Sequence, residues 1–104
     1  MSNLNVGDRV RCVNDSLPKD FKEEHYPNWV KHGKEYHIRQ ILNNDDIVVG
    51  VLLVEVVNPL LYIPLINALQ EGVFATWRFE KTLSASEVYR ETAKNTKVIH
   101  PILN

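Results

Sequence analysis

The alternation of hydrophobic and polar residues predicts a domain made mostly of short β-strands. Near the N-terminus, Val10 and Cys12 share one face of a strand, and Arg9 and Arg11 share the other. A second strand is expected over 35–42, again with apolar and polar side chains on opposite faces. Alternation with a period of two is typical of half-buried strands.

The second and third predicted strands each carry an irregularity. The alternation of the second strand changes phase at 40–41, which predicts a β-bulge or a strong bend. The Asn and Asp residues at 43–46 tolerate positive φ and predict a tight turn into a third strand over 47–57. The third strand is apolar almost throughout, so we expect both of its faces to be covered, with Gly50 allowing a kink.

A long polar segment, 17–34, separates the first two strands. It contains three aromatic residues, Phe21, Tyr26 and Trp29, which are too many for a purely solvated linker. We therefore expect a long loop that these rings attach to the β-structure, with a helical turn near 19–24.

The segment 60–71 is apolar, and the helical spacing of Leu65 and Leu69, with Gly72 as a C-cap, predicts a short helix there. The aromatic-rich segment 73–81 predicts a further strand.

The C-terminal part of the chain predicts a helix followed by an apolar tail. Ser84 stands three residues before Glu87, which is the spacing of a capping box, and a helix is expected over 85–94. Its apolar residues form one narrow stripe: Val88, Tyr89 and Ala93. The tail at 97–104 carries aliphatic side chains that need a surface on which to dock.

Composition and charge limit the function more than they define it. A chain of 104 residues is the usual size of one domain, and its net charge of −1 gives no overall field that attracts nucleic acid or an anionic membrane. Cys12 is the only cysteine, so an intramolecular disulfide cannot form. The polar N-terminus lacks the pattern of a secretory signal, and the run at 47–57 is about half the length that crosses a bilayer. We expect a cytoplasmic protein without a membrane partner.

Four motifs in order resemble a family of short uncharacterised proteins of phages, prophages and other bacterial mobile elements. They are VGDRV at 6–10, KHGKEYHI at 31–38, LLVEVVNP at 52–59 and ATWRF at 75–79, and the resemblance covers 6–82. It implies an SH3-like barrel fold, and it implies no activity.

We therefore predict a mostly β protein, a small SH3-like, partly open barrel with a long first loop and an added C-terminal helix. The pattern of strands is also compatible with an open five-stranded barrel of the OB kind. The barrel domain is expected to span 1–82, with an apolar insert at 59–72 that departs from the family's pattern. The segment 83–104 is expected to pack as helix and tail on the barrel or on a partner.

The residues that carry chemistry do not point to an enzyme. The four histidines have no recognisable metal-ligand spacing, either with one another or with two neighbouring aspartates: His25, His32, His37, His100, Asp45 and Asp46. Ser84 is used in a cap, and Cys12 is expected to be internal. We expect no catalytic residue, no metal and no cofactor.

The apolar excess of 47–69 is the most distinctive feature, because a patch of this size is rarely left in water. Either the C-terminal helix and tail cover it, or a second copy of the chain does. We favour a homo-oligomer, since one narrow helical stripe is small for so many aliphatic side chains. The candidate interface residues are Trp29, Val49, Val51, Leu53, Leu61, Tyr62, Leu65 and Trp77.

The two tryptophans have alternative interpretations. Trp29 and Trp77 either line a groove for an extended peptide or fill the core, and for Trp77 the core is favoured.

Four arginines on the strands, opposite the apolar phase, form a candidate face for anionic ligands: Arg9, Arg11, Arg39 and Arg78. The favoured alternative is that they pair with acidic residues of the chain, among them Asp8, Glu35, Glu55 and Glu80. The sequence thus predicts a non-catalytic binding or assembly module whose protein partner is most simply itself. The alternative is a small nucleic-acid-binding barrel that uses the arginine face.

Overall fold

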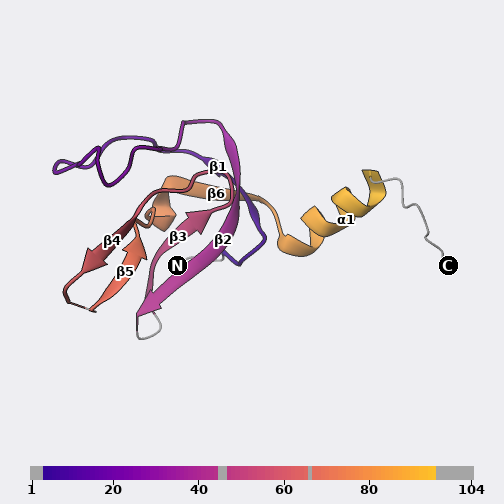
Figure 1. Cartoon of the computed structure of the whole chain (residues 1–104). Coiled ribbons are helices and arrows are strands. Elements are labelled where there is room, and N and C mark those ends of the chain that lie inside the picture. Colours follow the sequence, from indigo (N-terminus) through magenta and orange to yellow (C-terminus); the bar gives the residue numbers. More distant parts are fainter. Residues whose placement is uncertain (1–3, 45–46, 66, 96–104) are drawn as a thin grey trace.

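The computed structural model describes residues 4–44, 47–65 and 67–95, and these residues form a mostly β fold (Figure 1). The elements in chain order are β1 (Arg9–Cys12), β2 (Glu35–Asn44), β3 (Ile47–Leu53), β4 (Leu60–Ile63), β5 (Ala68–Glu71), the 3-10 helix η1 (Thr76–Arg78), β6 (Phe79–Leu83) and α1 (Ala85–Asn95). The predicted mostly β fold with a C-terminal helix is confirmed.

The larger sheet has four antiparallel strands in the order β3-β2-β1-β6. The β2–β3 pairing shifts register between Ile38 and Gln40, which confirms the predicted bulge. Beyond β3, Val51 and Phe74 exchange two backbone hydrogen bonds of 2.9 Å, so the chain around Phe74 extends that edge. Among the described residues no strand pair joins this segment to β6, so strand pairing by itself does not close a barrel.

The core packs against this sheet, and strands β1, β2 and β3 each contribute buried side chains to it. Val51, Leu52 and Leu53 are consecutive, and each is at most 3% exposed, which confirms that both faces of this part of β3 are covered. The remaining fully buried large side chains include Val10, Val30, Tyr36, Ile38 and Phe74.

The long first loop is attached to the core by its aromatic rings, as the sequence predicts. The ring of Trp29 lies 5.2 Å from that of Phe74, and the ring of Tyr26 lies 5.7 Å from it. The Tyr26 hydroxyl also donates a 2.9 Å hydrogen bond to the carbonyl of Val73. The predicted helical turn is displaced toward the C-terminal side, where the Tyr26 N–H contacts the carbonyl of Lys22.

The predicted helix within 60–71 is wrong, because β4 and β5 form an antiparallel hairpin there. Pro64 opens the turn, and the Asn67 N–H donates a 3.1 Å hydrogen bond to the Pro64 carbonyl. Asn67 has φ 48, a left-handed conformation that Asn tolerates and a helix excludes. The turn therefore separates Leu65 from Leu69, whose spacing had indicated a helix.

Two predicted strands are longer than the observed ones. The third strand ends at Leu53 rather than at 57, since the chain bends where Glu55 turns toward His37. The segment 73–81 is divided by η1, and β6 begins only at Phe79.

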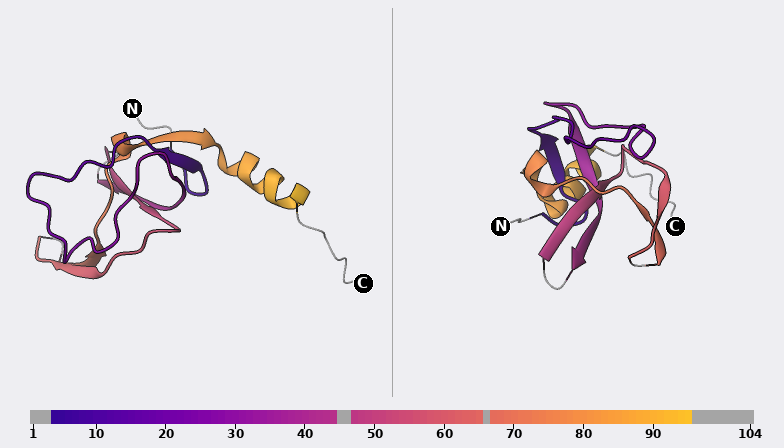
Figure 2. Two further views of the ribbon diagram at one scale, coloured as in Figure 1. Left: turned by 90° about the horizontal axis from the view of Figure 1, so that it is seen from above. Right: turned by 90° about the vertical axis from the view of Figure 1, so that its left-hand side faces the viewer.

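Helix α1 begins at the predicted capping box. The Ser84 N–H donates to Glu87 Oε1 at 2.8 Å, and the Glu87 N–H reaches Ser84 Oγ at 3.3 Å. The first turn is fixed to the sheet by buried Asp8, which accepts a 2.8 Å hydrogen bond from the Ala85 N–H. From there α1 extends away from the sheet, at the end of the molecule opposite the β4–β5 hairpin (Figures 1 and 2).

The apolar stripe of α1 is largely exposed within the chain. Tyr89 is 74% exposed, Ala93 is exposed and Val88 is half-buried. The predicted apolar tail lies outside the described residues.

Replacing Gly50 by alanine should destabilise the fold. A Cβ at Gly50 would lie 2.7 Å from Val73 Cγ2 and 2.8 Å from the Phe74 carbonyl oxygen, so this glycine allows a close approach of two chain segments. We expect Gly50→Ala to lower the free energy of unfolding by about 1–3 kcal/mol, measured by chemical denaturation. Val54→Ala, at an exposed position just after β3, is the control and should change it little. Equal stability of Gly50→Ala and the wild type would contradict this packing.

Candidate interaction surface

The β4–β5 hairpin exposes large apolar side chains on both strands and at its turn. We call this the apolar hairpin surface, and it consists of Leu60 (62% exposed), Tyr62 (57%), Leu65 (94%) and Leu69 (62%). Tyr62 pairs with Leu69 across the two strands, and Leu60 shares the face of Tyr62 because side chains alternate along a strand. Three of the four side chains therefore lie on one face of the hairpin.

The chain around this surface carries no charge. Positions 56–70 contain no Asp, Glu, Lys, Arg or His, although 24% of the whole chain is Asp, Glu, Lys or Arg. Exposed segments are normally kept apart from other chains by charged side chains. The uncharged hairpin lacks this protection.

The base of the hairpin is attached to the larger sheet by a polar contact. Glu71, the last residue of β5, is 5% exposed, and both of its carboxylate oxygens lie 3.0 Å from Arg39 Nη2. The Asn58 N–H donates to Glu71 Oε2 at 2.9 Å, and Arg39 Nε donates to the Leu53 carbonyl at 2.8 Å. The hairpin is thus fixed at its base without using its exposed leucines.

The predicted interface residues do not all reach the surface. Val51 and Leu53 are 0% exposed and belong to the core, so they do not face a partner. Val49 lies in β3, and its side chain is outside those that the structure describes. Leu61 is half-buried in β4.

Tyr62 and Leu65 are the predicted residues that the hairpin exposes. Leu60 and Leu69 join them on the surface but were not predicted. Because Leu60–Ile63 is apolar at every position, no alternation along the sequence indicated a strand there, and the helical spacing of Leu65 and Leu69 indicated a helix instead.

The two predicted tryptophans both lie against Arg78. Its guanidinium carbon is 5.0 Å from the centre of the Trp29 ring and 4.5 Å from that of Trp77. Trp29 is half-buried, whereas Trp77 is 59% exposed, so the favoured placement of Trp77 in the core is wrong. Trp77 lies in η1 and covers the cation from outside.

Arg78 itself is 5% exposed and serves the fold. Its Nη1 donates to the carbonyls of Ser16 at 2.6 Å and Asn14 at 3.2 Å, which fixes the start of the long loop. With its Nη1 bound to two carbonyls, two aromatic rings against it and 5% of its surface exposed, Arg78 presents little surface to an anionic ligand.

The other three arginines of the predicted anionic-ligand face are each paired within the chain. Arg9 Nη2 lies 2.7 Å from Glu91 Oε1 of α1, Arg11 pairs with Glu80 of β6, and Arg39 pairs with Glu71. Of the acidic partners that the sequence suggested for these arginines, only Glu80 is observed in an arginine pair. The four arginines lie in four separate contacts and do not form one open cationic patch.

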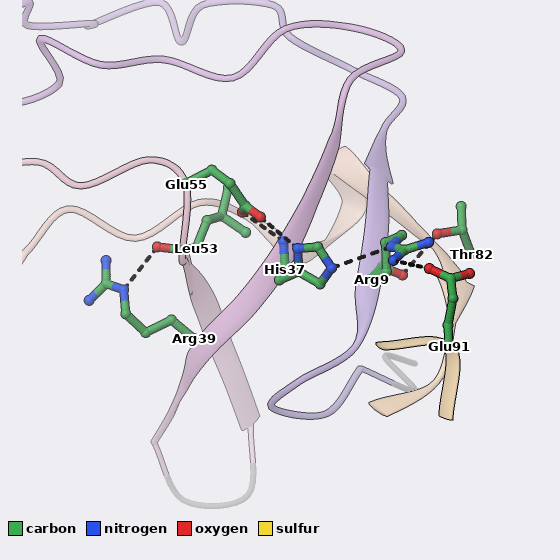
Figure 3. A network of polar contacts seen from close by, with 7 residues as sticks. All are labelled: Arg9, His37, Arg39, Leu53, Glu55, Thr82 and Glu91. Atoms are coloured by element: carbon green, nitrogen blue, oxygen red, sulfur yellow. Dashed lines mark hydrogen bonds and ion pairs between the residues drawn. The ribbon is translucent and has the colours of Figure 1, made fainter. Parts of the chain in front are cut away.

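Figure 3 shows one of these polar networks, which runs from Glu55 through His37 and Arg9 to Glu91. Arg9 Nε can only donate, so His37 Nε2, 3.3 Å away, must accept. His37 therefore carries its proton on Nδ1 and donates it to Glu55 Oε2, 2.5 Å away. The network ties β1 and β2 to the segment after β3 and to α1.

Electrostatics favour the charged form of both carboxylates at the ends of this network. Burial raises the pKa of Glu55, but hydrogen bonds from the His37 side chain and backbone outweigh it, so the pKa lies below its ordinary value. The hydrogen bond from Arg9 lowers the pKa of Glu91.

The described residues include one free thiol, which is buried, and no cluster suited to a metal ion. They contain no group of three or more His, Cys, Asp or Glu residues arranged to hold a metal ion. Cys12 is 0% exposed, and burial raises the pKa of its thiol, which disfavours the reactive thiolate.

Comparison of the chain with protein-family models, with curated proteins and with solved structures found no match. Within the described part of the chain, no helix has the length and apolar character needed to span a bilayer.

Replacing Arg78 by lysine should destabilise the protein although the charge is kept. Lysine lacks the planar group that lies over the rings of Trp29 and Trp77 and the geometry that reaches both carbonyls. We expect a loss of about 1–3 kcal/mol in the free energy of unfolding, measured by urea denaturation. Arg90→Lys, on the exposed side of α1, is the matched control. An unchanged midpoint of urea denaturation for Arg78→Lys would show that the contacts of the Arg78 guanidinium do not stabilise the fold.

The contribution of Glu55 to stability should depend on pH. Because its pKa is lower in the folded chain than in the unfolded chain, its stabilisation is fully present above the ordinary value of 4.5. It is lost as the pH falls through the folded-state pKa.

Glu55→Gln should therefore lower stability at pH 7, and its difference from the wild type should shrink below about pH 4. Chemical denaturation across this pH range measures it, with Glu23→Gln in the exposed loop as control. A difference that stays constant with pH would contradict the assignment.

Proposed function

We propose that this chain is a non-catalytic assembly module that binds a second copy of itself through the apolar hairpin surface. The observation that carries the proposal is that a hairpin fixed at its base by an ion pair to the buried carboxylate of Glu71 holds four large apolar side chains in solvent. Soluble chains rarely leave such side chains together in water unless the surface serves binding.

The position of α1 supports a partner in trans. The helix lies at the opposite end of the molecule from the hairpin, and its own apolar residue Tyr89 is exposed (Figure 2). The sequence left two ways of covering the apolar segment, by the C-terminal helix and tail or by a second copy. Helix α1 does not cover the hairpin. A second copy supplies an uncharged, apolar surface that matches the first.

Nucleic-acid binding is the less favoured function. Binding to phosphates depends on lysine and arginine side chains that are free to replace counterions. Here the four candidate arginines are bound within the chain, and the net charge is −1. Salt-dependent retention on mixed DNA and RNA that is lost in Arg9→Ala would favour this function instead.

The proposal also places the protein in the cytoplasm, as the product of a phage or prophage element. The four motifs described in the sequence support this origin. The genes that flank the gene for this protein test it. Neighbouring phage structural genes would agree with an assembly role.

We expect the protein to show concentration-dependent association. Light scattering after size-exclusion chromatography should give a mass of twice the 12.0 kDa chain, or a larger multiple, at micromolar concentration and above. Tyr62→Glu places a charge on the exposed apolar hairpin surface and should weaken association at least about tenfold.

Leu17→Glu is the matched control, because Leu17 is 57% exposed but lies in the first loop. It should associate like the wild type. A wild-type protein that stays monomeric at all concentrations would contradict the proposed function.

A further inference from the structure

The strand β4 is an edge strand without the usual protection. It belongs to a two-stranded sheet, and among the residues that the structure describes no third strand pairs with it. Proteins usually protect such edges with charged residues, proline or a bulge. The sequence Leu60–Ile63 contains no charge and no proline, and its register with β5 is regular.

We propose that β4 pairs with β4 of a second copy, antiparallel and edge to edge, so that two hairpins form one four-stranded sheet. The inference rests on the proposed self-association and specifies its geometry. The backbone N–H and C=O groups of β4 that point away from β5 would form hydrogen bonds with the same groups of the other copy.

The absence of charge favours a second copy over an unrelated partner. In a two-fold contact, each side chain lies near its own equivalent, so any charged residue near the axis would face a like charge. Positions 56–70 carry no charge, so the contact contains no such repulsion. An isolated two-stranded hairpin is only marginally stable in water, and the four-stranded sheet removes this weakness.

The symmetry places particular residues near the axis. A two-fold axis perpendicular to a sheet passes through a residue that faces its own equivalent, and for β4 the central candidates are Leu61 and Tyr62. In either register, the two copies of Tyr62 lie within about 8 Å of each other. Leu69 lies on the outer strand β5, so its two copies are about three strand spacings apart, roughly 14 Å.

A charge-swap experiment tests this arrangement. Tyr62→Glu and Tyr62→Lys should each weaken association at least about tenfold, because two like charges then lie close to the axis. An equimolar mixture of the two variants should restore association, since opposite charges face each other. Light scattering measures the mass of each sample, and circular dichroism checks that each variant is folded. Tyr62 is 57% exposed, so the monomer should tolerate either change.

Leu69→Glu mixed with Leu69→Lys is the matched control. These charges lie on the same face of the hairpin but farther apart than the Debye length of about 8 Å at physiological salt. Each of these changes should therefore weaken association less than the corresponding change at Tyr62, and mixing the two variants should alter the association little.

The outcomes separate the two proposals. A monomeric wild type would refute self-association itself. A wild-type dimer that tolerates charge at Tyr62, or that is weakened by it but not rescued by mixing, would leave self-association standing and overturn the pairing of the β4 edges. Equal rescue at positions 62 and 69 would also overturn it, because the axis would then not lie at β4.

Discussion

The ion pair between half-buried Arg39 and buried Glu71 determines how the apolar part of this chain is presented. It joins the central strand β2 to the last residue of β5, and the Asn58 N–H binds the same carboxylate just before β4 begins. Both ends of the hairpin are therefore fixed by one buried polar group. Because polar contacts hold the base of the hairpin, its exposed leucines are not needed for that attachment and are available to contact a partner.

The remaining charged and aromatic residues stabilise the β-structure around this point. Arg78 contacts the rings of Trp29 and Trp77 and binds the start of the long loop, and the loop in turn covers Phe74 beside β3. The outer face of the sheet carries paired charges, whereas positions 56–70 carry none. The charged side chains on the sheet thus have partners within the chain, whereas the apolar hairpin surface is left exposed.

Local signals allowed much of the fold to be predicted. The alternation in β1 and β2, the bulge near Gln40 and the capping box at Ser84 each depend on neighbouring residues, and each is confirmed. The hairpin was missed because its turn depends on the left-handed Asn67 and on a partner for Glu71 that lies 32 residues away. The exposure of Trp77 was missed because its neighbour Arg78 turns inward to carbonyls of Asn14 and Ser16, 64 and 62 residues away in the sequence. For the candidate site, the sequence identified the apolar segment but not which of its side chains face outward.

Amide hydrogen exchange at β4, followed as protein concentration rises, tests the central claim most directly. The account predicts that the outward-facing amides of Leu60–Ile63 become protected as the protein associates, while amides in the exposed first loop exchange at an unchanged rate. Association of the protein with no added protection at β4 would contradict the account.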